Sequence, residues 1–287
     1  MSGPIATTTP DGSRLHLQHG PIDLILEAWA PAPAVAGAYR RAWQRFRPLL
    51  DELVAELPAL RRPLEPGQRF TGAVASRMAA AVRPFDGRFV TPMAAVAGAV
   101  ADEICAEMVS GGGGLRRAYV NDGGDIALFL SAGESFDVGL VPVPERPALL
   151  GKATIRAEDA VRGIATSGRR GRSFSLGIAD AVTVLAANAA AADAAATLIA
   201  NAVDLPGHPA VRRERADDIE PDTDMGARLV TTEVGPLTAG EVDRAIEAGV
   251  AEARAMRDDG LIAAAVLCLR DRVATVAMPV LASADGG

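Results

Sequence analysis

Residues 117–130 read RAYVNDGGDIALFL, and this stretch carries the clearest strand and turn signals of the chain. The segment predicts a strand, a tight turn and a second strand around Asn121–Asp125. Two adjacent glycines, Gly123 and Gly124, remove every side chain from the bend, so a ligand could approach the backbone N–H groups there. Asn121 and Asp125 flank the bend with an amide and a carboxylate. An ordinary β-hairpin turn has the same composition, and both interpretations remain open.

Around this hairpin the chain alternates between strand-like and helix-like patterns. Apolar residues at spacings of three and four predict amphipathic helices, whereas shorter apolar runs predict strands. Helices are expected at Ala34–Leu57, Val74–Val82, Pro92–Met108, Asn188–Val203 and Glu241–Met256. Strands are expected at Arg14–Trp29 (a hairpin), Phe136–Val143, Arg162–Thr166, Ser173–Val184, Leu229–Val234, Leu261–Leu269 and Val273–Met278. Mixed elements of this kind indicate an α/β or α+β class.

The domain organisation predicted from the sequence is simple. No linker long enough to separate two domains is visible, so residues 13–281 are expected to form one domain. Residues 1–12 are expected to be a disordered N-terminus and 282–287 a loose tail, and the polar segment Arg212–Met225 a surface loop. Helices of small residues that carry one Asp occur twice, at Ala97–Asp102 and Ala189–Asp193. This echo hints at an internal duplication, although alanine-rich helices also resemble one another by chance.

Composition excludes several classes of protein. The formal net charge is −7, which argues against a nucleic-acid binder, because such proteins present a basic face. The N-terminus lacks the apolar core of a secretory signal, and the longest apolar runs are interrupted by Asp and Asn, so no membrane span is expected. Cys105 and Cys268 stand far apart in apolar stretches and are expected to be buried hydrophobes. A cytoplasmic protein is the expectation.

A second motif is the stretch GIATSGRRGRS at 163–173. Thr166 and Ser167 supply hydroxyls, Gly168 frees the backbone, and three arginines follow within a few residues. Hydroxyls, backbone amides and guanidinium groups all suit a phosphate, so the turn is a candidate anion site. A solvated basic turn is the alternative.

A third motif lies on the alanine-rich segment that follows. Asp193 and Thr197 are four residues apart, so both point to one side of a helix. A carboxylate and a hydroxyl are hard ligands of the kind that Mg²⁺ prefers. The alternative is an Asp at the surface or at a helix cap, with a Thr that bonds back to its own helix.

Together, the segments Asn121–Asp125, Ala165–Gly168 and Ala192–Thr197 resemble three signature segments of the ApbE-like family, in the family's order. Characterised members of that family are FAD:protein FMN transferases. The resemblance spans about Thr91–Val203, and the helix Met93–Asp102 is similar to a further family segment. The flanking residues look closer to an uncharacterised cytosolic branch of the family.

The resemblance implies a compact, possibly internally duplicated sheet-and-helix domain that holds FAD or another flavin nucleotide together with Mg²⁺. It implies metal ligands at Asp193, Thr197 and the backbone carbonyl of Ala94. The residues that it places around the nucleotide are Asn121, Gly123, Gly124, Asp125, Thr166, Ser167, Gly168 and Arg172. An acceptor protein and a homodimer are possible partners on the same basis.

The sequence also departs from the transferase pattern. Ala97 stands where the transferases carry a lysine, and Phe174–Asp180 replaces a segment that contains histidine in those enzymes. An ammonium group and an imidazole near a diphosphate would serve charge neutralisation and proton transfer. The arginine turn could replace the charge, but His208 is more readily a structural residue than a base, so no catalytic residue is assigned. Two hypotheses follow: an enzyme with FMN transferase-type phosphodiester chemistry, or a non-catalytic flavin- or metabolite-binding module that has lost the transferase residues.

Overall fold

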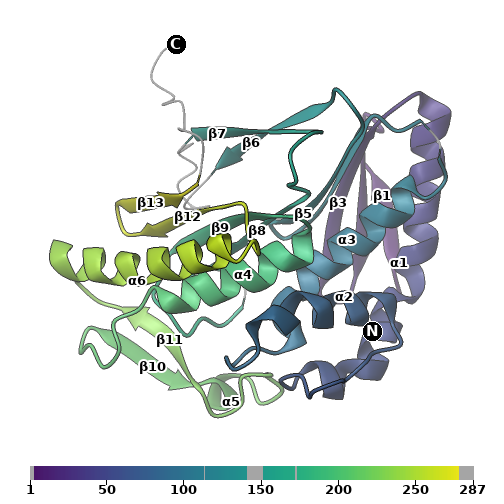
Figure 1. Cartoon of the computed structure of the whole chain (residues 1–287). Helices are drawn as coiled ribbons and strands as arrows, with labels where there is room; N and C mark the ends of the chain where they lie inside the picture. Colours follow the sequence, from purple (N-terminus) through teal and green to yellow (C-terminus); the bar gives the residue numbers. More distant parts are fainter. Residues whose placement is uncertain (1–2, 113, 141–150, 172, 278–287) are drawn as a thin grey trace. The chain divides into compact units, whose positions relative to one another are not determined.

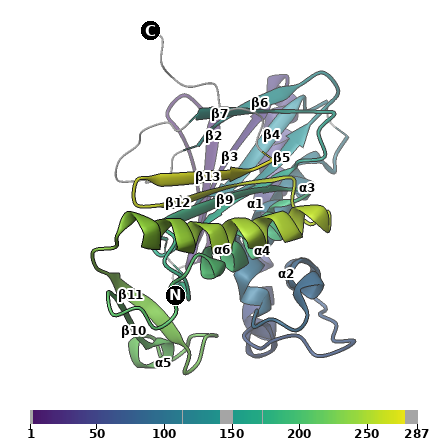
Figure 2. The same cartoon turned by 60° about the vertical axis from the view of Figure 1, so that its left-hand side comes forward.

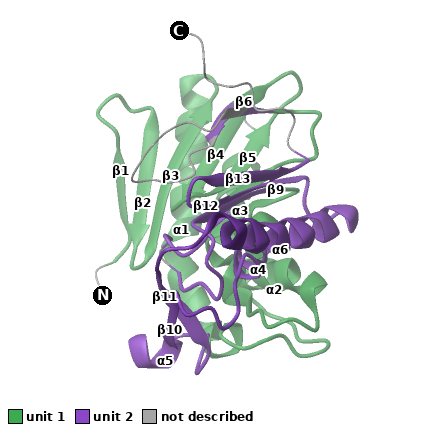
Figure 3. Ribbon diagram, turned by 90° about the vertical axis from the view of Figure 1, so that its left-hand side faces the viewer, with its two compact units in different colours: residues 1–136, 155–165, 186–194 green, residues 137–154, 166–185, 195–287 purple. Residues whose placement is uncertain are grey.

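The computed structural model describes residues 3–112, 114–140, 151–171 and 173–277. These residues group into two compact units, coloured separately in Figure 3. Unit 1 comprises residues 1–136, 155–165 and 186–194, and unit 2 comprises residues 137–154, 166–185 and 195–287. The chain passes back and forth between these two units, and the expectation of one domain over residues 13–281 stays a prediction. The predicted tail at 282–287 and Arg172 lie outside the described residues.

Helices and strands are mixed along the whole chain, as Figure 1 shows, which confirms the predicted α/β class. The helices are α1 (Ala32–Leu60), α2 (Ala73–Val82), α3 (Val96–Val109), α4 (Ala189–Ala202), α5 (Ala216–Ile219) and α6 (Ala239–Asp258), with short 3₁₀ turns η1 (Arg83–Phe85) and η2 (Pro92–Ala95). The strands are β1 (Ile5–Thr8), β2 (Arg14–His19), β3 (Ile22–Trp29), β4 (Arg117–Asp122), β5 (Asp125–Leu130), β6 (Ser135–Leu140), β7 (Gly151–Arg156), β8 (Gly163–Ser167), β9 (Ala181–Ala186), β10 (Val211–Arg215), β11 (Leu229–Val234), β12 (Ala264–Leu269) and β13 (Arg272–Val276).

Unit 1 is built on an antiparallel sheet. Neighbouring strands pair in the order β1-β2-β3-β4-β5, and the start of β8 pairs with β5. Every second residue of β3 is buried, so one face of the sheet carries the apolar side chains. Helix α1 contacts β2 and β3, and α3 contacts β4 and β5. Phe46 and Leu49 of α1 are fully buried, so the amphipathic stripe seen in the sequence faces the core.

Unit 2 contains the antiparallel strands β9, β12 and β13, in that order. Helix α6 runs along β12 and β13 (Figure 2), and it begins with a capping box in which Thr238 and Glu241 exchange hydrogen bonds. Gly249 on α6 allows this close packing, because a Cβ there would lie 2.3 Å from Val203 and 2.8 Å from Leu267. Strands β10 and β11 form a separate antiparallel pair.

Several predictions at the margins of elements were wrong. Residues 5–8 form β1 within the segment that was expected to be disordered, because their backbone pairs with β2. Residues 211–219 form strand β10 and helix α5, whereas a loop was expected at Arg212–Met225. Strand β9 begins only at Ala181, and β7 was not predicted. The strand predicted at Phe136–Val143 corresponds to β6, and its last three residues lie outside the described part.

Both cysteines are buried, as predicted. In the described part of the chain, no helix combines the length and the apolar run that a bilayer crossing would need.

Candidate functional site

The Asn121–Asp125 segment forms the tight turn between β4 and β5. Gly123 and Gly124 both have positive φ, at 63° and 118°, as a two-residue hairpin turn of the type I′ family requires. The Oδ1 atom of Asn121 accepts a hydrogen bond from the N–H of Gly124 at 2.8 Å. The Asn121 side chain therefore closes the turn, which is the structural role that the hairpin interpretation assigns to it.

Two carboxylates stand at the base of this turn. Asp122 and Asp125 are directly opposite each other in the β4–β5 register, so their side chains project to the same face of the sheet. That face is the buried one, because Asp122 lies on the same side of β4 as Ala118 and Val120, and all three residues are buried. Asp125 was predicted as a site residue and Asp122 was not, although the alternation along β4 places Asp122 inward.

A third carboxylate, Asp193 of α4, belongs to the same unit. Its Oδ2 atom accepts a hydrogen bond from the N–H of Gly98 at 3.1 Å, and the N–H of Ala97 also bonds to it. Burial raises the pKa of Asp193 well above its usual value, and the negative charges of Asp125 and Asp122 raise it further. The two backbone N–H groups act in the opposite direction without cancelling the effect.

The donor set of this acidic group, defined as Asp122, Asp125 and Asp193, is compatible with a divalent cation. Carboxylate oxygens are hard ligands, and a cation would relieve the mutual repulsion that adds to burial in raising the pKa of Asp193. Within the described ranges, no group of three or more His, Cys, Asp or Glu side chains is arranged to hold a metal ion. A cation here would therefore take fewer than three carboxylates and complete its shell with neutral oxygens and water, as Mg²⁺ commonly does.

The other predicted metal ligands lie nearby in sequence but have different surroundings. Ala94 belongs to the turn η2, just before α3, and its N–H donates to the carbonyl of Thr91 at 3.1 Å. Thr197 lies four residues after Asp193 on α4 and belongs to unit 2, where its hydroxyl donates to Ser167 Oγ at 3.4 Å. That distance is long for a hydrogen bond between two hydroxyls, so the interaction holds the Thr197 hydroxyl only weakly.

Within unit 2, the Thr166–Gly168 turn is held by its own neighbours. The hydroxyls of Thr166 and Thr183 are 2.9 Å apart and share a hydrogen bond. Gly168 has φ of 148°, and a Cβ there would lie 2.7 Å from the carbonyl oxygen of Asp180. Glycine is therefore required at this position by backbone packing alone.

Buried Asp180 organises the arginine turn. Its Oδ1 atom accepts hydrogen bonds from Arg169 Nη2 at 2.5 Å and from Arg170 Nε at 3.0 Å. Its Oδ2 atom accepts the backbone N–H of Arg270 at 2.6 Å. Asp180 is only 2% exposed, so these arginines satisfy a buried charge. This arrangement favours a structural role for Arg169 and Arg170 over the anion site expected from composition.

His208 has a structural environment. Its Nε2 atom lies 3.0 Å from Glu241 Oε1, and its Nδ1 atom accepts the N–H of Ala210 at 3.2 Å. Both ring nitrogens are thus engaged, and Glu241 also belongs to the capping box of α6. The preference for a structural His208 agrees with this geometry.

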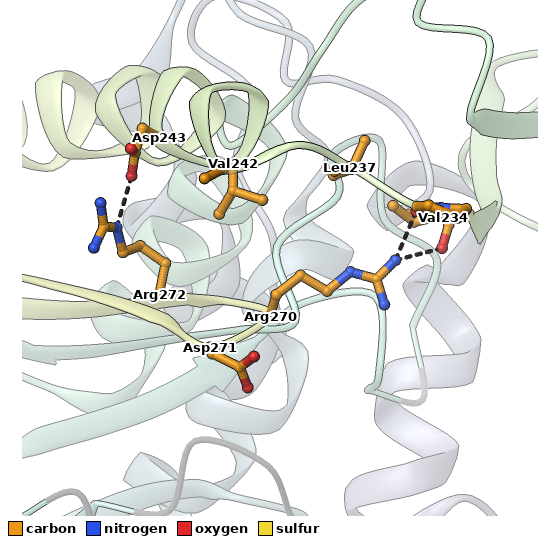
Figure 4. Close-up of a pocket in the computed structure, with 10 residues that line it drawn as sticks. Val234, Leu237, Val242, Asp243, Arg270, Asp271 and Arg272 are labelled. Atoms are coloured by element: carbon orange, nitrogen blue, oxygen red, sulfur yellow. Dashed lines mark hydrogen bonds and ion pairs between the residues drawn. The ribbon is translucent and has the colours of Figure 1, made fainter.

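A separate pocket of about 660 Å³ lies in unit 2 beside the start of α6 and the β12–β13 turn (Figure 4). The Arg270 guanidinium donates to the carbonyls of Val234 and Gly235 at 2.6 and 2.8 Å, and Arg272 donates to Asp243 at 2.6 Å. Valine, proline and leucine side chains form the apolar part of the lining. The residues predicted from the sequence as ligands do not line this pocket.

Fold and site together define a mixed α/β protein with a glycine-turn hairpin and a partly buried acidic group beside it. A family model described as "AbpE bacteria" matches residues 6–275. The chain therefore belongs to this ApbE-like family, which confirms the resemblance inferred from the motifs.

Relatives with similar sequences are archaeal UPF0280 proteins. One from Methanopyrus kandleri is 39% identical over 163 residues, which cover 56% of this chain and 63% of the relative. One from Methanosarcina acetivorans is 32% identical over 184 residues, which cover 63% of this chain and 70% of the relative. The chain thus spans a little under two thirds of the Methanopyrus protein.

Two solved structures also align. The apo form of the flavinyl transferase ApbE of Pseudomonas stutzeri aligns with 13% identity and a TM-score of 0.43, over 95% of this chain and 93% of that one. An ApbE protein of Thermotoga maritima aligns with 16% identity and a TM-score of 0.31, over 70% of this chain and 71% of that one. The family assignment rests on the family model.

Proposed function

We propose that this protein binds a flavin nucleotide together with a divalent cation, and that it uses them for phosphodiester chemistry of the FMN transferase type. The observation that carries the proposal is the acidic group of unit 1. A carboxylate whose pKa is raised by burial and by neighbouring Asp125 and Asp122 is destabilised when ionised. A bound cation would offset that cost and keep the carboxylate ionised.

The roles of the individual residues follow from their positions. Asp193 would hold the cation with Asp125, and Asp122 would add negative charge from the buried face of β4. The Gly123-Gly124 bend presents backbone without side chains, so part of the nucleotide could pass close to it. Thr197 remains a proposed ligand one helical turn beyond Asp193, and Thr166–Gly168 a proposed nucleotide contact. When bound, the cation would neutralise charge on the diphosphate.

The proposal is tested by titrating the protein with FAD and with FMN, following flavin fluorescence with and without Mg²⁺. We expect flavin binding that tightens when Mg²⁺ is present. Asp125→Asn should remove the Mg²⁺ effect, because it removes one of the two charges assigned to the cation. Asp258→Asn is the matched control, since that carboxylate is 64% exposed and pairs with its neighbour Arg257. Absence of flavin binding at high micromolar concentration would reject the proposal.

The chemical step is tested separately. Transfer of FMN from FAD breaks the diphosphate bond, so AMP is released as FMN joins an acceptor. We expect Mg²⁺-dependent release of AMP from FAD when a suitable acceptor protein is supplied. Tight binding of FAD without AMP release under any of these conditions would identify a binding module in place of an enzyme, in keeping with Ala97 at the family's lysine position.

A further inference from the structure

Helices α3 and α4 cap each other through one aspartate apiece. Asp102, on α3, accepts the N–H of Ala189 through Oδ1 at 3.0 Å and the N–H of Ala190 through Oδ2 at 2.9 Å. In return Asp193, on α4, accepts the N–H groups of Gly98 and Ala97 at the start of α3. Each carboxylate therefore satisfies N–H groups that the other helix cannot satisfy internally.

The first turns of the two helices are in backbone contact. A Cβ at Gly98 would lie 2.3 Å from the carbonyl oxygen of Ala189 and 2.7 Å from the N–H nitrogen of Ala190. Gly163 of β8 presses on the same place, since a Cβ there would lie 2.2 Å from the nitrogen of Ala189. The start of α4 is thus fixed by close packing from two sides, and Asp102 supplies its hydrogen bonds.

The spacing of the aspartates links the two caps. Asp193 lies four residues after Ala189, and Asp102 lies four residues after Gly98. Residues four apart stand above one another on a helix. Any shift of the first turn of α4 is therefore passed to Asp193, and with it to the distances from Asp193 to Gly98 and Asp125.

We propose that Asp102 is a positioning residue for the cation site: it anchors the first turn of α4 against α3 and thereby holds Asp193 against the N–H of Gly98, within the acidic group. This inference rests on the proposed function for the identity of the ligand, a divalent cation, and on the hydrogen bonds above for the mechanism. Each Asp102 oxygen accepts a backbone N–H from the first turn of α4, so the role assigned to Asp102 is to hold that turn. Its effect on the cation passes through Asp193.

The test compares two ways of weakening the start of α4. Asp102→Ala removes the cap supplied by α3, whereas Asn188→Ala removes a cap within the segment itself, because Asn188 Oδ1 accepts the N–H of Ala191 at 2.8 Å. Both variants should lower the melting temperature. Only Asp102→Ala should weaken binding of Mn²⁺, measured by calorimetry on the full chain, and the loss should be roughly ten-fold to a hundred-fold. Equal losses of Mn²⁺ affinity in both variants would overturn the proposal.

A second readout needs no ligand. The amide of Gly98 is protected by Asp193 and is not touched by Asp102, so its hydrogen exchange reports the position of Asp193. In Asp102→Ala this amide should exchange as fast as it does in Asp193→Ala, while Asn188→Ala should keep it protected. If the Gly98 amide stays protected in Asp102→Ala, the positioning role is wrong, whatever the metal data show.

The two readouts separate the two proposals. If the wild-type protein binds neither Mn²⁺ nor Mg²⁺ but Gly98 responds as expected, the proposed function fails and the positioning of Asp193 by Asp102 stands. Asp102→Asn serves as a milder variant in case Asp102→Ala does not fold, because asparagine keeps the shape of the side chain and one of its two acceptor oxygens. It should give an intermediate exchange rate at Gly98, and wild-type exchange in this variant would contradict the inference.

Discussion

Asp180 is the residue whose removal should be felt most strongly in unit 2. Its side chain is 1% exposed and pairs with Arg169 and Arg170, while the Arg270 backbone donates to its second oxygen. Asp180→Ala removes the acceptor of three hydrogen bonds, which come from the Arg169 and Arg170 side chains and the Arg270 backbone. It also leaves the Arg169 guanidinium, whose Nε is buried, without its carboxylate. Breaking a buried pair in this way costs about 3–5 kcal/mol. With an m-value of about 2–3 kcal/mol/M, the urea midpoint should fall by about 1–2.5 M.

Urea unfolding followed by circular dichroism measures this loss. The control is Asp243→Ala, which removes the exposed partner of Arg272, with side chains 39% and 59% exposed. Exposed ion pairs contribute little, so the control midpoint should be nearly unchanged. If Asp180→Ala shifts the midpoint no more than Asp243→Ala, the carboxylate does not hold the arginine turn, and the anion-site interpretation of that turn would regain support.

Three further predictions concern unit 1. Gly163→Ala places a methyl group 2.0 Å from the Asn188 carbonyl carbon and should cost roughly 1–3 kcal/mol in urea unfolding, whereas Gly240→Ala, with only Arg244 at 3.9 Å, should be neutral or stabilising. Because the pKa of Asp193 is raised by burial and by the charges of Asp125 and Asp122, its stabilising contribution is present at low pH and is lost as the pH rises. Asp193→Asn should therefore gain thermal stability relative to wild type as the pH rises above about 4, and a constant difference would contradict this. Burial alone would raise the pKa of Glu103, but hydrogen bonds from Arg45 and Arg77 hold that pKa below its ordinary value. Glu103→Gln should therefore be less stable than wild type at neutral pH, and this difference in stability should close as the pH falls below about 4.

Local patterns in the sequence were enough to predict most elements. The hairpin at 117–130 carries its own turn chemistry, and α1 and α6 show their buried stripe directly. Strand β1 was not predicted, because its four exposed residues show no alternation of buried and exposed positions. Its strand conformation depends on pairing with β2, which the local sequence does not reveal. Strand β10 is mostly polar and half-exposed, so its residues resemble a loop until β11 pairs with them.

The candidate site was predicted only in part, for a related reason. Asp125 and Asp193 were named from their motifs, but their relationship depends on contacts between residues far apart in the chain. Asp102 bonds residues 87 and 88 positions away, and Asp180 bonds the Arg270 backbone 90 positions away. No periodicity encodes such pairs. Asp122 is the exception, since strand alternation alone would have turned it inward.

The alternation of the chain between its two units has a consequence for dissecting the protein. The chain changes unit after residues 136, 154, 165, 185 and 194, and the last of these points falls inside α4. A single cut cannot release either unit as a continuous piece, so truncated fragments should fail to fold where a string of separate domains would survive. Variation in this fold is therefore expected to accumulate by substitution and by lengthening of loops, and exchange of whole segments with other proteins should be rare.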